Sequence, residues 1–423
     1  MSKARKTVKP DETKAISGTT RTFGKRFPIR HLIAIGLIAG VAFLAYSNTF
    51  HAPFHFDDLP NIVQNPLVHI RTLTWDQLER LVKVTYRETI RVFSMLTFAF
   101  NFYFGEGDVF GYHLVNMIIH ILAGVFLYGF LFLTFNLPHL KDTYGSIAYK
   151  AALFASLIFI SHPIQTQSVT YIVQRMASMG GMFYLLCMVL YVKGRLSTGG
   201  SRFVWFGGLV VCYLLGVFSK ENVAILPVFL VLYEFYFFQN LELSPKGKKI
   251  VITLIGVVLI LGAIGFAVWG RRYIELTIAG YEYRTFTMAE RVLTQCRVVL
   301  YYVTLLIYPH PSRLNLDYDF PISRTMVDPP TTLISILIIA GLLGYSIWSA
   351  KKRPMVSFWI LWYFGNLVIE SSIFPLEMVY EHRLYLPAVG PFVLFSLLVL
   401  RGLERLKQRS ALAKPVAGSR GLT

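Results

Sequence analysis

The chain has 423 residues, of which 55% are hydrophobic and only 15% are charged, and its net charge is +18. Soluble domains carry about 25% charged residues, so this composition excludes an ordinary soluble protein and predicts an all-α polytopic membrane protein. The positive charge does not indicate nucleic-acid binding, because most Lys and Arg residues lie in short loops and near the two ends, as the positive-inside rule expects.

The chain starts with a polar, basic segment, 1–30, which predicts a disordered cytoplasmic tail. Residues 31–50 are apolar and long enough to cross the roughly 30 Å hydrocarbon core of a bilayer. A long polar and aromatic loop, 51–111, follows. Within it the apolar residues of 75–83 recur at helical spacing, which predicts a helix lying in the membrane interface.

The remaining apolar segments predict nine further spans, and one segment, 291–308, is ambiguous. Counting it as a span would place the basic connection 351–353 outside, whereas an interfacial or re-entrant helix keeps every Lys/Arg-rich connection inside. We therefore expect about ten transmembrane helices within a membrane domain over 31–400, both termini in the cytoplasm, and a basic tail over 401–423. The nine further spans are expected near 112–135, 148–161, 168–192, 203–218, 222–238, 250–269, 331–350, 355–371 and 385–400.

This topology brings the unusual polar groups of the chain to the outer face. The orientation rests on positive charge alone, so their convergence there indicates a functional site. The outer connections 51–111, 161–168, 219–221, 270–330 and 371–384 hold Asp57-Asp58, His162, Lys220-Glu221, Asn315-Leu316-Asp317 and Glu381-His382-Arg383.

Asp57 and Asp58 follow directly on the first apolar segment. Neighbouring carboxylates repel each other, so one of them can keep a raised pKa and act as a general base, or the two can bind a divalent cation. A helix cap or a solvated pair in a loop stays open as an alternative. No cofactor is required by these residues.

Positively charged residues at the outer helix ends form the second group of interest. A helix starting near Ser168 would place Gln167, Tyr171 and Arg175 on one face. An Arg at membrane depth is costly and is by default a functional candidate, although snorkelling or an ion pair with Glu221 is the alternative for Arg175.

Arg91, Lys220, His382 and Arg383 are cations at other outer helix ends, and as a cluster they can hold an anionic phosphate. Singly, each could instead anchor the chain to lipid headgroups. A third group, His113, Asn116 and His120 on the second span, predicts interhelical hydrogen bonds rather than ligand binding.

Several motifs occur in order between residues 54 and 392, among them "FHFDD", "HPIQTQSVTYIVQR", "SKEN", "LNLDYDFP" and "YEHRLYLPAVGPF". In these motifs the chain resembles the membrane portion of the transmembrane and tetratricopeptide-repeat O-mannosyltransferases, of the GT-C superfamily. The resemblance implies a multi-span enzyme that uses a polyprenyl-phosphate-linked sugar on the outer face, with Asp57 and Asp58 as catalytic residues.

The sequence departs from this family at three points. The usual HPxHTE motif reads His162 to Gln167 with two glutamines, which weakens a metal site. The usual Arg-Pro reads Arg91-Val92, and the chain ends soon after the last expected span, without the repeats that would engage a protein acceptor.

These observations predict an inverting glycosyltransferase of the GT-C type that transfers a sugar, mannose by resemblance, from polyprenyl phosphate to a hydroxyl group. Asp57 or Asp58 would be the base. The leaving phosphate would be held by Arg91, Arg175, Lys220 and Arg383, with His162, Glu221 and His382 in supporting roles. Transfer to a glycan or lipid, or a polyprenyl-lipid flippase, are the alternatives, and a bacterial inner membrane with a periplasmic site is the expected location.

Overall fold

The computed structural model describes residues 28–412, so most of the expected tail 1–30 and the end of the expected tail 401–423 lie outside the described residues. Within this range the chain is helical and contains no strand. The all-α prediction is therefore confirmed. The helices are α1 (Ile29–Tyr46), α2 (Trp75–Glu88), α3 (Val92–Gly105), α4 (Val109–Phe135), α5 (Pro138–Tyr144), α6 (Ala148–Ser161), α7 (Thr166–Thr170), α8 (Arg175–Leu196), α9 (Ser201–Val217), α10 (Leu226–Tyr233), α11 (Pro245–Gly265), α12 (Arg271–Gly280), α13 (Met288–Ile307), α14 (Thr331–Ser349), α15 (Pro354–Leu367) and α16 (Val389–Leu412).

The chain is a multi-pass membrane protein. Six helical segments of the described chain are long and apolar enough to cross a membrane, or seven if the pair α5 and α6, bent by 86°, forms one span. This is fewer than the ten expected. The difference arises because α9 and α15 have only 17 and 14 residues and because charged residues begin at Arg401 in α16. The six are Ile29–Thr49, Val109–Phe135, Ile172–Leu196, Glu221–Phe238, Pro245–Tyr283 and Thr331–Ser349.

Helices α4 and α8 lie at the centre of the bundle; α1 and α6 pack on α4, α9 packs on α8, and α16 packs on α6 and α15. Small residues let neighbouring helices approach closely where the lipid offers no hydrophobic driving force for packing. At Gly181 of α8, an added Cβ atom would lie 2.5 Å from the ring of Tyr385. This close approach brings the segment before α16 against α8.

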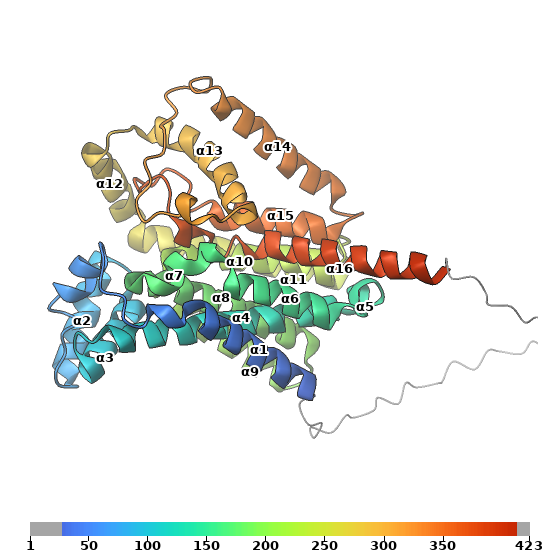
Figure 1. Ribbon diagram of the computed structural model, residues 1–423, viewed down its shortest axis with the longest axis horizontal. Helices are drawn as coiled ribbons and strands as arrows, with labels where there is room; N and C mark the ends of the chain where they lie inside the picture. Colours follow the sequence, from blue (N-terminus) through green and yellow to red (C-terminus); the bar gives the residue numbers. More distant parts are fainter. Residues whose placement is uncertain (1–27, 413–423) are drawn as a thin grey trace, which may run out of the picture.

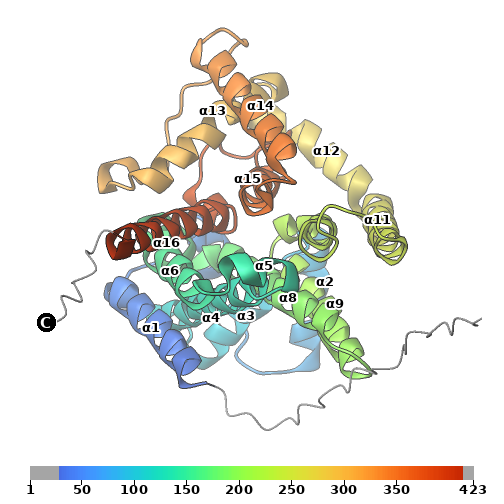
Figure 2. The same cartoon turned by 90° about the vertical axis from the view of Figure 1, so that its right-hand side faces the viewer.

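Different helices and turns lie at the two ends of the bundle (Figure 1). The start of α1, the end of α16 and the turn between α14 and α15 lie at one end, whereas α2 and α3 lie at the other. Viewed along the bundle, α13 runs across its axis (Figure 2), and three charged residues, Glu290, Arg291 and Arg297, interrupt its apolar sequence. The orientation of α13 agrees with the interfacial or re-entrant helix expected at 291–308.

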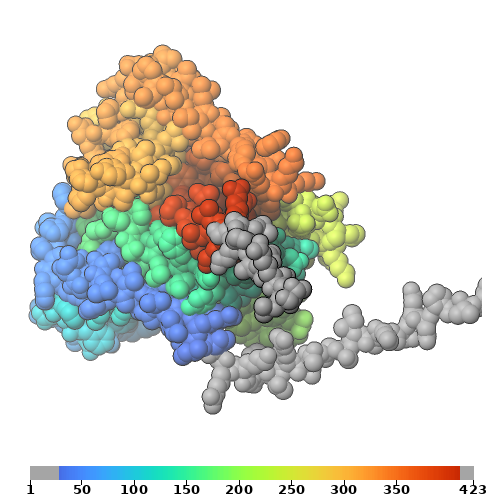
Figure 3. Space-filling model, turned by 45° about the vertical axis from the view of Figure 1, so that its right-hand side comes forward, coloured from blue at the N-terminus to red at the C-terminus, as the bar shows by residue number. Residues whose placement is uncertain are grey.

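Helix α14 stands away from the rest of the bundle, as the orange residues at the top of Figure 3 show. Only 17% of its 18-residue apolar window is buried, against 83% for the window that contains α8. An exposed apolar helix of this kind is a surface for lipid rather than for water. The lipid-facing part of the molecule therefore includes α14 and, with 6% of its window buried, α11.

Candidate active site

Asp58 is buried in the loop that follows α1 and is held by two backbone groups. Its carboxylate oxygens accept hydrogen bonds from the N–H of Val173, at 2.7 Å, and from the N–H of His55, at 3.0 Å. The side chain is only 1% exposed, and burial raises its pKa to about 6. Asp58 thus joins loop 54–63 to the segment that leads into α8.

Asp57 points the other way and has an exposed side chain. Its backbone N–H donates to the hydroxyl of Tyr171 at 2.7 Å, and its carbonyl accepts from the side chain of Asn61 at 2.8 Å. Both bonds involve the backbone, so the loop is held in place while the carboxylate stays accessible. Of the two aspartates, Asp57 has the geometry of a group that can meet a substrate.

The segment expected to begin a helix at Ser168 is instead broken. α7 ends at Thr170, and Tyr171 is extended, with φ −78° and ψ 108°. The free backbone groups at the break bind side chains: Val173 N–H donates to Asp58, and the Asn116 amide donates to the carbonyls of Val169 and Ile172 at 3.2 Å. The prediction that Gln167, Tyr171 and Arg175 share one helix face was therefore wrong, because helical spacing does not continue across this break.

Arg175 begins α8 and is completely buried. Its guanidinium donates to Asn116 Oδ1 at 2.6 Å, to the carbonyl of Tyr112 at 3.0 Å and to Thr97 Oγ1 at 3.2 Å. It also lies 4.5 Å from the ring centre of Phe98. These contacts join α3, α4 and α8. The alternative partner named for it, Glu221, binds Arg91 instead.

A cluster of cations and carboxylates, the cation cluster, lies at the start of α3 and beyond the end of α9. Arg91 Nε donates to both oxygens of Glu221, at 3.0 Å, and Lys220 Nζ lies 2.8 Å from Glu370. Lys220 and Glu370 are both buried. The structure thus brings Arg91, Lys220 and Glu221 together as expected and adds Glu370, which the sequence analysis did not name.

The segment 380–383 completes this cluster. His382 donates its backbone N–H to Gln167 Oε1 at 2.8 Å, and Arg383 donates to the carbonyl of Met378 at 3.0 Å. The ring of Tyr380 stacks on His382, with centroids 5.0 Å apart, and Arg383 lies 5.2 Å from the same ring. Burial raises the pKa of Tyr380 and the charge of Asp57 adds to the shift. Tyr380 therefore contacts Arg383 and His382 and is close enough to Asp57 to feel its charge.

Arg291 of α13 holds the loop that carries Glu370. It is fully buried and donates to the carbonyls of Glu370, at 2.9 Å, and of Ser372, at 3.2 Å. It also contacts the carbonyls of Leu376 and Glu377. The sequence analysis missed Arg291 and Glu370. The signal was available: Arg291 is a cation within an apolar helix, and Glu370 is an acid at the end of one.

His162 does not join the cation cluster. Its Nε2 atom lies 3.1 Å from the carbonyl of Leu306, and its Nδ1 accepts from the N–H of Ile164. His120 is likewise fully bonded, to the Tyr385 hydroxyl at 2.8 Å and the Ile160 carbonyl at 3.1 Å. His113 binds the carbonyl of Ala52. Asn116 and His120 thus make the predicted bonds to other helical segments, whereas His113 binds a loop carbonyl instead.

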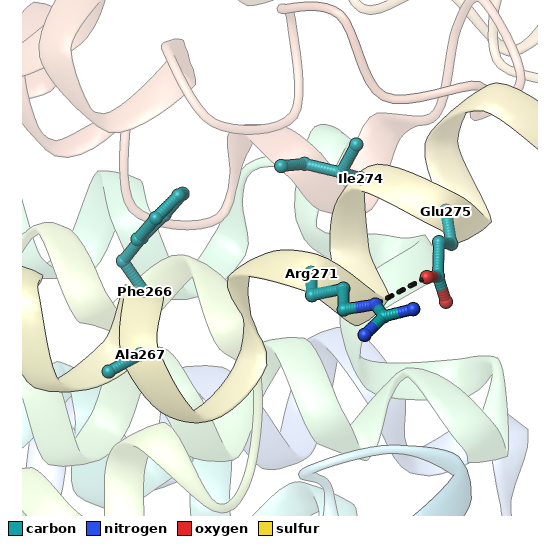
Figure 4. A pocket seen from close by; sticks show the side chains of 5 residues that line it. All are labelled: Phe266, Ala267, Arg271, Ile274 and Glu275. Atoms are coloured by element: carbon teal, nitrogen blue, oxygen red, sulfur yellow. Dashed lines mark hydrogen bonds and ion pairs between the residues drawn. The ribbon is translucent and has the colours of Figure 1, made fainter.

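Within residues 28–412, no group of three or more His, Cys, Asp or Glu side chains is placed to hold a metal ion. The aspartate pair does not offer a ready divalent site either, because both oxygens of Asp58 already accept backbone hydrogen bonds. A shallow depression lined by Phe266, Ala267, Arg271, Ile274 and Glu275 lies over the start of α12 (Figure 4). Its lining contains none of the site residues.

The chain is similar in sequence to proteins named as protein O-mannosyl-transferases. It is 28% identical over 346 residues to tmtc2 of Xenopus laevis, 23% over 405 residues to F38B6.6 of Caenorhabditis elegans, and 23% over 421 residues to human TMTC3. These matches cover 74%, 90% and 91% of this chain. The resemblance expected from the motifs is confirmed.

The chain spans about half or less of the length of these relatives, namely 39%, 53% and 44%. No family model matches the chain, and no solved structure matches it. The comparisons therefore concern the part of each relative that aligns with this membrane-spanning chain.

Proposed function

We propose that this protein is a glycosyltransferase that moves a sugar, mannose by similarity, from a polyprenyl-phosphate donor to a hydroxyl group of an acceptor. One observation carries the proposal. An accessible carboxylate, Asp57, lies close enough to Tyr380 to influence it, and the same Tyr380 ring contacts Arg383, which lies with Arg91 and Lys220 around His382. The names of the similar proteins point to the same reaction.

The reaction is a displacement at the anomeric carbon. The acceptor oxygen forms a bond to that carbon as the bond to the phosphate oxygen breaks, and the electron pair leaves on the phosphate. Asp57 accepts the proton of the hydroxyl group. Attack from the face opposite the leaving group inverts the configuration.

The residues around Asp57 support its role as the base. Asp58 holds the loop in place through its two backbone hydrogen bonds, so it positions Asp57 rather than taking the proton. Arg91, Lys220 and Arg383 outnumber the carboxylates Glu221 and Glu370 around them, which leaves positive charge to stabilise the departing phosphate. The donors of Arg175 are engaged inside the bundle, so its role is to hold α3, α4 and α8 together next to the site.

The site would face the periplasm or an equivalent lumen, opposite the two ends of the chain. A bacterial inner membrane is the proposed location. Loop residues at that end lie near the surface of the outer leaflet, so the donor lipid can present its phosphate from the membrane. A protein acceptor is proposed because the similar proteins are named as protein O-mannosyl-transferases.

The test is transfer of label from polyprenyl-phosphate mannose to a crude envelope fraction by the purified protein. Asp57→Asn should lower the rate about 10²- to 10⁴-fold, the usual contribution of a general base, while binding of the donor is retained. Asp76→Asn is the matched control, since Asp76 is an exposed acid of the same loop, and it should leave the rate unchanged.

Each outcome decides between the candidate functions. Label recovered in protein supports the proposal, whereas label in polysaccharide or lipid moves the acceptor to another class. If the donor crosses vesicle membranes without any covalent product, the chain is a lipid transporter and the proposal fails. An Asp57→Asn protein that transfers sugar at the normal rate would remove Asp57 from the mechanism.

A further inference from the structure

The protonation of His382 can be read from its partners. Gln167 Oε1 lies 2.8 Å from the backbone nitrogen of His382, and since that nitrogen can only donate, the Gln167 atom is an acceptor oxygen. The same oxygen lies 2.9 Å from His382 Nδ1. An amide oxygen cannot donate, so Nδ1 must carry the hydrogen. In a neutral ring, the lone pair is then on Nε2.

The Nε2 atom has no hydrogen-bond partner among residues 28–412. The ring is held flat against Tyr380 and is only 7% exposed. His120, by contrast, has both ring nitrogens bonded. His382 is thus a fixed imidazole with one unused acceptor atom beside the cation cluster.

The groups that face this ring are cations. Burial lowers the pKa of His382 well below its usual value, and Lys220, Arg383 and Arg91 lower it further. The two carboxylates of the cluster are engaged, Glu370 with Lys220 and Glu221 with Arg91. Glu381, the next residue along the chain, accepts instead from Asn315 and Tyr318. The ring therefore stays neutral and supplies a lone pair among hydrogen-bond donors.

A sugar phosphate needs both kinds of partner, since its phosphate oxygens accept hydrogen bonds and its hydroxyl groups donate them. Arg91, Lys220 and Arg383 can serve the phosphate, but none of them can accept a hydrogen bond. We propose that Nε2 of neutral His382 accepts a hydrogen bond from a hydroxyl group of the transferred sugar and so orients the donor. This inference rests on the proposed glycosyl transfer and adds a substrate-binding residue to it.

The first variant is His382→Asn. The Asn amide can donate to Gln167 from the position of Nδ1 but leaves nothing in the position of Nε2. Sugar transfer should fall about 10- to 100-fold, the effect of one lost hydrogen bond at a buried group. Binding of sugar-free polyprenyl phosphate should be unchanged. His310→Asn, on an exposed His away from the cluster, is the control.

The second variant is Gln167→Glu, which keeps the size of the side chain but adds a negative charge next to Nδ1. The charge favours the imidazolium form and raises the pKa of His382 above its value in wild type. Selective ¹⁵N-histidine NMR should therefore show His382 becoming protonated at a higher pH than in wild type. The His382 signals are identified by their absence in the double variant with His382→Asn, because no imidazole remains there.

Two results would overturn the inference. One is an equal loss of sugar-free polyprenyl phosphate binding in His382→Asn, and the other is a Gln167→Glu protein in which the protonation of His382 does not move to higher pH. Selective ¹⁵N-histidine NMR, with the His382 signal assigned by its absence in His382→Asn, measures the tautomer without any transfer reaction. A protonated Nε2 in that spectrum would also refute the inference. If the Nδ1–H form is found but no sugar is transferred by wild type, the proposed function fails rather than the chemistry of His382.

Discussion

Two loop carboxylic acids, Asp58 and Glu381, are buried, form no ion pair with any residue of 28–412 and bind hydrogen-bond donors instead. Burial raises the pKa of Asp58 to about 6 and that of Glu381 to about 7. A buried acid of this kind binds its proton more tightly in the folded state than in the unfolded chain. Its effect on stability therefore has a definite sign.

For Asp58, the unfolded value is near 3.8 and the folded value is about 6. The stabilisation is greatest below the unfolded value and is lost as the pH rises through the folded value. Between these two pH values the free energy of unfolding should fall by about 3 kcal/mol. Melting temperatures measured in detergent from pH 4 to 7 should fall with rising pH in wild type and fall less in Asp58→Asn. Glu381→Gln should remove the part of the pH dependence that is due to Glu381. Parallel profiles would contradict the assignment.

The buried pair of Lys220 and Glu370 permits a test by double substitution. Removing one partner leaves an uncompensated charge, so Glu370→Gln alone should cost about 3–5 kcal/mol. Adding Lys220→Met should recover part of that stability, because the stranded cation is removed. Melting temperatures of the two single variants and the double variant measure the coupling. Additive losses would show that the ion pair contributes nothing.

At the scale of elements, α13 differs from the spans because its charged residues have specific loop partners. Arg291 donates to the carbonyls of the loop after α15, whereas Arg297 donates to Pro321 O and Ser323 Oγ of another loop. Helix α13 therefore holds two loops through two different arginines. The loop bound by Arg291 carries Glu370 and so reaches the cation cluster.

The two arginines of α13 form a matched pair for hydrogen exchange. Lysine has a single ammonium nitrogen and lacks the planar five-donor fork with which Arg291 bonds these separated carbonyls, so Arg291→Lys should raise the exchange rate of the amides of 369–378 by about tenfold or more. Arg297→Lys should instead affect residues near 321–323. If Arg291→Lys leaves 369–378 protected, α13 does not hold that loop in place.

At the scale of the whole molecule, α2 and α3 lie at the end of the bundle opposite the start of α1 and the end of α16 (Figure 1), and Arg91 of the cation cluster directly precedes α3. In the proposed orientation that end is outside. A variant with Cys187, Cys212 and Cys296 replaced by serine should allow labelling of single cysteines. Asp76→Cys in α2 should react with an impermeant thiol reagent in intact cells, and Arg353→Cys should react only after the membrane is opened. The reverse pattern would invert the proposed topology.

The sequence by itself determined the class of the molecule and the position of most helices. Apolar segments such as 112–135 and 148–161 agree closely with α4 and α6, because lipid requires long apolar helices whose backbone groups are bonded internally. Helix α3 was missed, since its 14 residues are too few to cross a bilayer and its apolar sequence was read as part of a loop. The helical end of α16, through Leu412, was missed because charge predicted a tail.

Only the tertiary structure decided how the polar residues are used. Asp57 and Asp58 are neighbours with the same chemistry, yet one is exposed and the other is bound by the N–H of Val173, which lies far along the chain. Arg175 and Arg91 were equivalent candidates, but the first is enclosed by α3, α4 and α8 and the second pairs with Glu221. Periodicity describes a side chain within its own helix. Its partners come from other helices, and their positions depend on packing across the whole bundle.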